Sequence, residues 1–296
     1  MSTVAQVVDR ILRDWLHAPD DQPTRFTLNG ALAAGATSLT YDDDLLTPEE
    51  EDLLGPGTLI EVGSEQILVG SVNEDTNVLS GLIRGANGTT DADHADAALV
   101  TLAPAWARKT IFDAVADAIE QLWPELYTTT TSGALTLSST QYTEVPAVVQ
   151  GVLYLWVRPS GGDQYEKWHA PLLENFPPSS TTKAIWPGFS GSGYLVYKAK
   201  PTRPTLETDS MATLGVEDEW EQLVVVSAVA YLISGKDLSA ATQEFLSDNL
   251  NAQGYPVDSS RRIREGLLRY QGYLIDKAKR TLRHRHDTPV TNLSAF

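Results

Sequence analysis

Apolar residues recur at helical spacing in the N-terminal, central and C-terminal parts of the chain. Helices are predicted in five stretches, 3–16, 104–123, 218–233, 239–250 and 259–285. In the last stretch, one face carries Ile263, Leu267, Tyr270 and Leu274. Because a helix with one apolar stripe must bury that stripe, we expect these helices to pack against one another.

Two regions between the helical stretches show short β-branched runs separated by turn residues. In the first region, strands are predicted over 37–41, 58–62, 66–72, 78–83 and 98–102. Gly63-Ser64 and Asn87-Gly88 supply turn signals there. In the second region, strands are predicted over 134–137, 142–145, 148–157 and 194–198. Each region therefore predicts an antiparallel β module.

Together these patterns predict an α+β protein. The N-terminal, central and C-terminal helices are expected to form a helical bundle that carries two inserted antiparallel β modules. The expected division is a helical body of residues 1–20, 103–127 and 215–287, a first β module of 21–102, a second β module of 128–214 and a C-terminal tail of 288–296.

The composition narrows the class of protein. The chain has no cysteine, which excludes disulfides, thiolate metal sites and a thiol nucleophile, and folding in a reducing cytoplasm is expected. Residues 1–16 lack the basic and apolar pattern of a secretory signal. The longest apolar run, 223–233, is shorter than a membrane span requires, so we expect a soluble protein.

Charge is distributed unevenly along the chain. The net charge is -17, yet residues 258–296 carry nine Lys or Arg against four Asp or Glu. The remaining 257 residues carry 13 basic and 35 acidic side chains. Because affinity for DNA depends on neutralising phosphates, this acidic body disfavours sequence-specific DNA binding. The acidic body is compatible with DNA that slides past it without being bound.

The acidic residues gather in one segment and the basic residues in another. The acidic candidates are Asp42, Asp43, Asp44, Glu49, Glu50, Glu51 and Asp52. We interpret them as an exposed loop and helix start; the alternative is an electrostatic wall that faces a partner or a channel. The basic end and the tail that follows it predict a cationic contact surface, with Arg280, Arg283, Arg285, Val290 and Phe296 as candidates.

Candidate catalytic and metal-binding residues are few. Asp91, Asp93, His94 and Asp96 lie close in sequence, but their spacing fits no calcium loop, and a solvated turn is the preferred interpretation. Ser192 lies in a Gly/Ser-rich segment that lacks the second glycine of a nucleophile elbow, and we interpret it as a flexible loop. No nucleophile, base and orienting group occur together, so we expect no enzyme activity, no cofactor and no metal.

A β module of tailed-bacteriophage virion proteins resembles the first β region. The resemblance rests on the segments Ala36 to Tyr41, Gly57 to Val69, Arg84-Gly85-Ala86-Asn87-Gly88-Thr89-Thr90 and His94-Ala95. The terminal helices, with Tyr270, Tyr273, Ala278, Arg280 and Arg283, are similar to those of tailed-phage head-to-tail connector (adaptor) proteins. The region from about Thr129 to Leu214 departs from small adaptors.

The resemblance implies a structural role in the virion. It implies a twelve-subunit ring below the portal protein, contacts with neighbouring copies and with a tail or neck protein, and DNA passing through without sequence-specific binding. The implied location is the head-tail junction, with no membrane contact, after folding in the host cytoplasm. One alternative is a tail or baseplate subunit.

A second alternative, from a different class, is a phage carbohydrate-binding or hydrolytic protein. It would use Trp156, Trp168 and Trp186 to stack on sugars. The preferred interpretation of these tryptophans is a hydrophobic core, because they occur in otherwise apolar strands.

Overall fold

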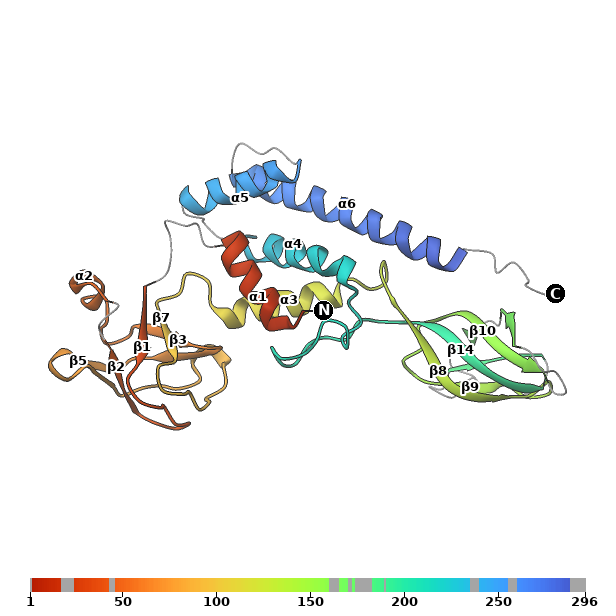
Figure 1. The fold of residues 1–296 in the computed structure, drawn as a ribbon, viewed down its shortest axis with the longest axis horizontal. Helices are drawn as coiled ribbons and strands as arrows, with labels where there is room; N and C mark the ends of the chain where they lie inside the picture. Colours follow the sequence, from red (N-terminus) through yellow and green to blue (C-terminus); the bar gives the residue numbers. More distant parts are fainter. Residues whose placement is uncertain are drawn as a thin grey trace. The chain divides into compact units, whose positions relative to one another are not determined.

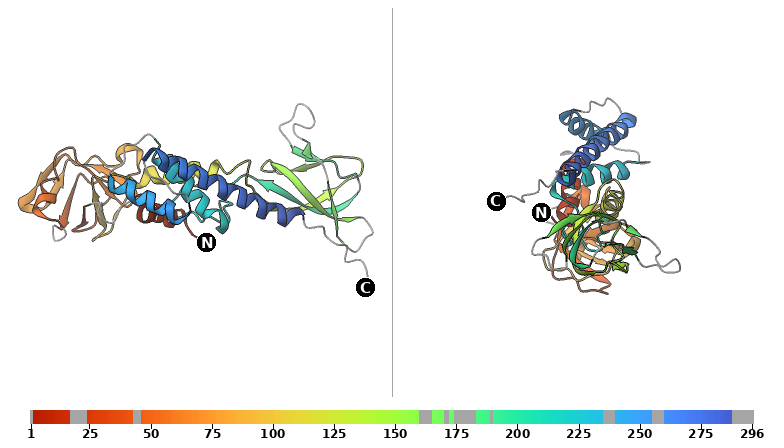
Figure 2. Two further views of the ribbon diagram at one scale, coloured as in Figure 1. Left: turned by 90° about the horizontal axis from the view of Figure 1, so that it is seen from above. Right: turned by 90° about the vertical axis from the view of Figure 1, so that its right-hand side faces the viewer.

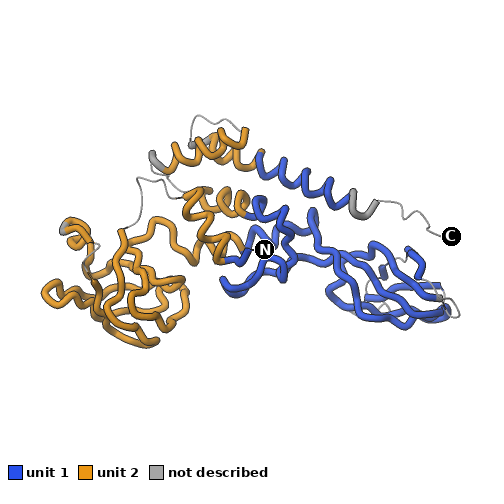
Figure 3. The backbone as a smooth tube through the Cα atoms, viewed as in Figure 1, with its two compact units in different colours: residues 1–4, 116–224, 270–296 blue, residues 5–115, 225–269 orange. Residues whose placement is uncertain are grey.

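The computed structural model describes residues 2–16, 24–42, 46–159, 165–169, 172–173, 183–188, 190–234, 240–254 and 260–287. The chain divides into two compact units (Figure 3). Unit 1 comprises residues 1–4, 116–224 and 270–296, and unit 2 comprises residues 5–115 and 225–269. No helix in the described part of the chain is long and apolar enough to cross a membrane.

Unit 2 contains a seven-stranded antiparallel sheet. Its strands are β1 (Arg25–Leu28), β2 (Ser38–Asp42), β3 (Leu59–Val62), β4 (Glu65–Leu68), β5 (Ser71–Asn73), β6 (Val78–Ser80) and β7 (Leu99–Leu102). They lie in the order β4-β3-β7-β1-β2-β6-β5. The short strand β1 is central because it pairs with both β2 and β7. The Gly63-Ser64 turn joins β3 to β4, with Val62 opposite Glu65.

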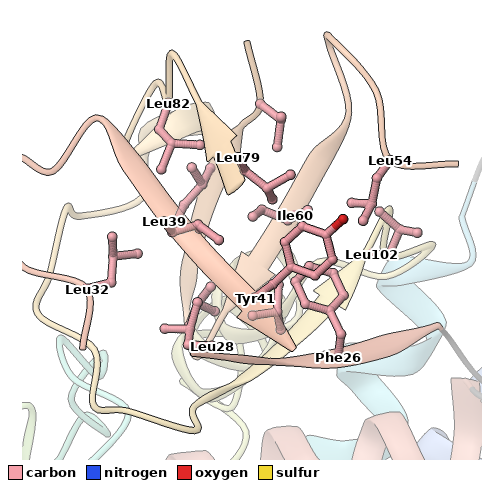
Figure 4. Close-up of a cluster of buried hydrophobic side chains, with 14 residues drawn as sticks. Phe26, Leu28, Leu32, Leu39, Tyr41, Leu54, Ile60, Leu79, Leu82 and Leu102 are labelled. Atoms are coloured by element: carbon pink, nitrogen blue, oxygen red, sulfur yellow. The ribbon is translucent and has the colours of Figure 1, made fainter. Parts of the chain in front are cut away.

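The core of this sheet is built by alternation along each strand. Phe26 and Leu28 of β1 and Leu39 and Tyr41 of β2 are buried, whereas their neighbours are not. Figure 4 shows these side chains converging with those of Ile60 and other strands. The rings of Phe26 and Tyr41 meet edge to face, with centroids 5.3 Å apart. Each large side chain buried in this way contributes about 1.5–3 kcal/mol to folding.

Unit 1 contains two further antiparallel sheets. Their strands are β8 (Thr128–Leu137), β9 (Thr143–Val145), β10 (Gly151–Pro159), β11 (Glu166–Trp168), β12 (Leu172–Leu173), β13 (Lys183–Ile185) and β14 (Gly191–Ala199). One sheet has the order β11-β10-β14-β8 and the other β12-β13-β9. The long strands β8, β10 and β14 run side by side in Figure 1 and in the left-hand view of Figure 2. The two sheets share one core, which includes Leu155, Leu195 and Ile185.

Six α-helices occur in the described residues, along with short helical turns. They are α1 (Val4–Ile11), α2 (Pro48–Glu51), α3 (Arg108–Glu120), α4 (Glu221–Leu232), α5 (Ala240–Ala252) and α6 (Ser260–Asp287). A π-helical stretch, Leu12–Leu16, continues α1, and 3₁₀ turns occur at Glu74–Thr76, Ala86–Gly88 and Asp218–Trp220. Within α6, the predicted apolar face is confirmed at Ile263, Leu267 and Tyr270, which are buried.

The predicted helical bundle with two inserted β modules is wrong. The protein is mixed α+β, but strands dominate its described elements, with fourteen strands in three sheets against six α-helices. The sheets have hydrophobic cores of their own, so they are not small modules inserted into a helical body. Helices α1, α3, α4 and α6 each contribute residues to both units. Helical spacing predicts that a helix buries one face, but it does not specify the partner.

Candidate functional site

A buried carboxylate organises the edge of the seven-stranded sheet. Glu65 of β4 is 1% exposed, and its Oε1 accepts hydrogen bonds from Arg84 Nε at 2.7 Å and from the N–H of Gly85 at 3.1 Å. Its Oε2 accepts from Arg84 Nη2 at 2.7 Å, from His94 Nε2 at 2.7 Å and from the N–H of Ala92 at 3.2 Å. We call Glu65, Arg84 and His94 the Glu65 clamp.

The guanidinium of Arg84 extends the clamp to two more segments. Its Nη1 donates to the carbonyl of Ala33 at 2.8 Å, and its Nη2 donates to the carbonyl of Ala92 at 2.6 Å. Nη2 also lies 2.9 Å from Asp91 Oδ1. The planar fork of arginine suits this arrangement because it offers several donors in fixed directions. One side chain thereby ties together three parts of the chain that are distant in sequence.

The loop after Arg84 adopts a conformation that its residues permit locally. Gly85, Asn87 and Gly88 have φ values of 62°, 52° and 77°, in the left-handed region that glycine and asparagine tolerate best. Asn87 Nδ2 donates to Gln66 Oε1 at 2.7 Å, and Thr89 Oγ1 accepts from the N–H of Gln66 at 3.0 Å. The Arg-Gly-Ala-Asn-Gly-Thr-Thr loop is therefore anchored on β4.

Electrostatics keep Glu65 and Arg84 ionised. Burial alone would raise the pKa of Glu65, but hydrogen bonds from Arg84, His94 and two backbone N–H groups outweigh burial and lower this pKa to about 2. The same contact with Glu65 raises the pKa of Arg84. Because Glu65 is ionised, Nε2 of His94 must carry the proton that it donates. The five hydrogen bonds occupy this carboxylate, which suits it to hold the loops in place.

In the acidic run after the loop, where a solvated turn was predicted, Asp93 and Asp96 are exposed, and the carboxylates also bind backbone N–H groups. Asp91 Oδ2 accepts from the N–H of Gly35 at 2.8 Å, Asp93 Oδ1 from Ala34 at 2.7 Å and Asp96 Oδ1 from Gly30 at 2.7 Å. These carboxylates satisfy the backbone donors of the loop that follows β1. In the described part of the chain, no three His, Asp or Glu side chains converge in a metal-binding arrangement.

A groove of about 610 Å³ lies within unit 2, beside the clamp. Its lining includes Asp9, Arg25, Glu61 and His94. Glu61 is buried in β3, and its Oε2 accepts the N–H of Arg108 at 2.8 Å, at the start of α3. A carboxylate at this position accepts a hydrogen bond from a first-turn N–H, which has no acceptor within the helix, and it interacts favourably with the helix dipole.

Most of the described acidic candidates support local structure. Thr47 and Glu50 form a capping box for α2, because Glu50 Oε2 accepts the N–H of Thr47 and Thr47 Oγ1 accepts the N–H of Glu50. These contacts lower the pKa of Glu50. Asp42 accepts a hydrogen bond from Asn29, and Glu51 accepts one from Tyr41.

The remaining acidic candidates fall into two groups. Glu49 lies within the same short helix and Asp52 directly follows it, and both are exposed. Asp43 and Asp44 lie outside the described residues. The predicted helix start is therefore confirmed at α2, and the alternative of an electrostatic wall stays a hypothesis.

The basic candidates are separated by what the structure describes. Arg280 and Arg283 lie on α6 and are exposed. Arg285 belongs to the same helix, but its side chain is outside the described set, as are Val290 and Phe296. The structure thus places two of the five candidates for a cationic contact surface on an exposed helix surface.

The three tryptophans do not form one platform. Trp168 and Trp186 are 42% and 43% exposed, so the core interpretation is wrong for both. Trp156 is half-buried and pairs across the sheet with Lys167, whereas Trp168 pairs with Leu155. Adjacent residues of a strand point to opposite faces, so Trp156 and Trp168 lie on opposite faces of one sheet. Trp186 follows β13 of the other sheet.

Sequence reasoning missed the importance of Glu65. Glu65, Arg84 and His94 all lie in segments that carry the resemblance, but no contact between them was predicted, and a glutamate in a hairpin normally faces water. One feature of the sequence pointed to burial of Glu65. It directly follows the exposed Gly63-Ser64 turn and lies within a run of apolar residues. Its partners, 19 and 29 residues away, are brought to it only by the fold.

Comparison of the chain with protein-family models found no match, and comparison with curated proteins found none either.

Proposed function

We propose that this chain is a structural subunit of a tailed-bacteriophage head-to-tail connector. In this role it forms a ring below the portal protein, DNA passes through the ring, and the tail attaches to it. The observation that carries the proposal is the Glu65 clamp, because the residues that resemble virion β modules are the ones that build it. The resemblance therefore rests on residues that hold the loops of the β module in place.

The choice of a connector within the virion rests on the helices and on charge. Helix α6 resembles the terminal helix of connector proteins, and it presents Arg280 and Arg283 to solvent in a chain of net charge -17. Cations on an exposed helix speed the encounter with an acidic groove. The segment after the helix contains Phe296, whose ring can supply buried apolar area at such an interface.

The proposal is tested by assembly on portal rings of the phage that encodes this chain. Native mass spectrometry of the mixture should show a ring of this chain on each portal ring. Substitution of Arg280→Glu together with Arg283→Glu should weaken this assembly at low and moderate salt. The matched control is Arg269→Glu, which reverses a charge on the same helix at a side chain that is 74% exposed.

Two outcomes would overturn the proposal. One is a wild-type chain that shows no assembly with portal rings. The other is an electron image of labelled virions that places the chain along the tail or in the baseplate, which would select the tail or baseplate alternative instead.

A further inference from the structure

The four-stranded sheet of unit 1 has two faces of different chemistry. Leu155 of β10 and Leu195 of β14 are cross-strand partners, and both are fully buried in the shared core. Trp156 pairs with Tyr194 on β14 and with Lys167 on β11. Because cross-strand partners share a face and adjacent residues alternate, these three side chains lie on the face opposite the core. We call this the outer face.

Aromatic rings form a continuous row on the outer face. The rings of Tyr154 and Trp156 meet edge to face with centroids 5.8 Å apart, and those of Tyr165 and Tyr194 are also 5.8 Å apart. Trp156 and Tyr194 are direct cross-strand partners, so the two pairs adjoin. Tyr194 and Tyr165 are 38% and 45% exposed. Single exposed aromatic residues are ordinary, whereas adjoining ones mark a binding surface. We call these four residues the aromatic row.

Cations accompany the row. Lys167 Nζ lies 4.2 Å from the centroid of the Tyr154 ring, and Lys198 Nζ lies 4.3 Å from that of Tyr127. Arg158 follows Trp156 by two residues and is exposed on the same face, opposite Ser192. A cation over an aromatic ring is attracted to its face, so the row and the cations form one surface.

Carboxylates are absent from the described pairing positions of this face. Those positions hold Thr129, Thr131, Ala134 and Thr136 on β8; Ser192, Tyr194, Val196 and Lys198 on β14; Tyr154, Trp156 and Arg158 on β10; and Lys167 on β11. Glu166 pairs with Val157 and so faces the other way. A locally positive surface on a chain of net charge -17 is complementary to an anionic ligand.

We propose that the outer face binds an anionic polysaccharide, with sugar rings stacked on the aromatic row and acidic groups held by Lys167 and Arg158. Tyrosine and tryptophan suit this ligand because each offers a flat apolar ring together with a polar group. The threonine and serine hydroxyls beside the row can donate to and accept from sugar hydroxyls. This role is separate from ring assembly and does not depend on it.

Single-stranded nucleic acid is the main competing ligand. It also stacks on aromatic residues of a sheet beside cations. However, it carries a phosphate at every nucleotide, and its affinity depends on how many phosphates the protein neutralises. Three cations in a chain of net charge -17 are few for that purpose. A polysaccharide with acidic groups on only some of its sugars needs fewer cations, so the charge pattern favours it.

The test uses the full chain in affinity electrophoresis through gels that contain hyaluronan, neutral dextran or single-stranded oligothymidine. We expect retardation by hyaluronan above that by the other two. Tyr194→Ser and Trp156→Ala should each weaken hyaluronan binding about tenfold or more, the loss expected for one stacked ring. Lys167→Gln should weaken binding of hyaluronan, because it removes a cation from the site.

The matched control is Trp168→Ala. Trp168 is 42% exposed and neighbours Lys167 on β11, but it pairs with Leu155 and so faces the other way. This variant should bind hyaluronan as the wild type does. Circular dichroism checks the fold of each variant, and Tyr194→Ser keeps the test decisive if Trp156→Ala does not fold.

Several results would overturn the inference. Equal retardation by dextran would remove the requirement for an anion, and stronger retardation by oligothymidine would assign the face to nucleic acid. No retardation of the wild-type chain by hyaluronan, or unchanged binding by Tyr194→Ser, would also overturn it. Sedimentation that shows Tyr194→Ser abolishing self-association, with hyaluronan binding retained, would assign the face to a second copy of the chain.

Discussion

The seven-stranded sheet of unit 2 and the four-stranded sheet of unit 1 differ in where their charged and polar side chains lie. In the first, Glu61, Glu65 and Gln66 are buried, and their carboxylate and amide groups connect loops to strands. In the second, the described core holds apolar side chains, and the cations lie on the outer face.

This difference separates charged groups that hold the fold together from charged groups that can contact a ligand. A buried ion pair is costly to form and costly to break, so it specifies one arrangement of the loops around it. A half-buried cation beside an aromatic ring, such as Lys167, contributes modestly to stability, and it can exchange its contact for one with a ligand. The Glu65 clamp therefore belongs to the fold, whereas the outer face is open to a partner.

The largest expected effect comes from Glu65→Gln. This variant removes the buried charged partner of Arg84, whose side chain is 5% exposed, and leaves it only the more exposed Asp91; it should lower the free energy of unfolding by about 3–5 kcal/mol. Urea unfolding at neutral pH, with hydrogen exchange of the amides in 59–102, measures the loss. Glu74→Gln is the control, because Glu74 is exposed. A loss below about 1 kcal/mol would contradict the role assigned to the clamp.

Acid should weaken unit 2 through the same group. The folded pKa of Glu65 is about 2 against an ordinary value of 4.5, so the unfolded chain takes up the proton first as the pH falls. The clamp then contributes about 3 kcal/mol above pH 4.5, and this contribution is lost between pH 4.5 and about 2. Urea unfolding across this range should show a steeper loss for the wild type than for Glu65→Gln. Parallel curves for the two proteins would contradict the assignment.

Gly85→Ala should have an intermediate effect. Gly85 has a φ of 62°, and a Cβ there would lie 2.9 Å from the carbonyl oxygen of Thr89. Backbone strain and this contact together should lower stability by about 1–3 kcal/mol. Gly88→Ala is a close control, because its φ is 77° but a Cβ would meet nothing within 4 Å. Thermal unfolding should show the larger loss for Gly85→Ala; the reverse order would be inconsistent with a tightly packed loop.

The smallest expected effect is that of Tyr194→Ser on stability. Its ring is 38% exposed on the outer face, so its loss should cost under about 1 kcal/mol. The next residue, Leu195, is fully buried, and Leu195→Ala should cost about 2–5 kcal/mol. Urea unfolding of the two variants compares the two faces of one strand. Similar losses for both would show that the outer face is packed like the core.

Local patterns predicted much of the secondary structure and little of the site. The strands at 37–41 and 98–102 were predicted within about a residue of β2 and β7, because alternation and turn residues act over short distances. The central strand β1 was missed, since its four residues contain only two apolar positions. The polar run of threonines at the start of β8 was not predicted as part of a strand, although β-branched threonine favours strands.

The candidate site depended on contacts that no local pattern contains. The segments that contain Glu65, Arg84 and His94 were noticed through a resemblance, but the contacts of Glu65 with the other two join residues 19 and 29 positions apart. The exposure of Trp168 was also mistaken, because an aromatic residue in an apolar strand gives no sign of which sheet face is covered.

By itself, the sequence determined many of the strands and helices, the absence of cysteine chemistry and the contrast between an acidic body and a basic end. These follow from the spacing and kind of neighbouring residues. Only the tertiary structure decided that strands form three sheets with cores of their own, that Glu65 is buried with Arg84, and that Trp156 and Tyr194 share an exposed face. The physical reason is that strand pairing joins residues far apart in the chain. No short stretch of sequence specifies which strands become neighbours in a sheet.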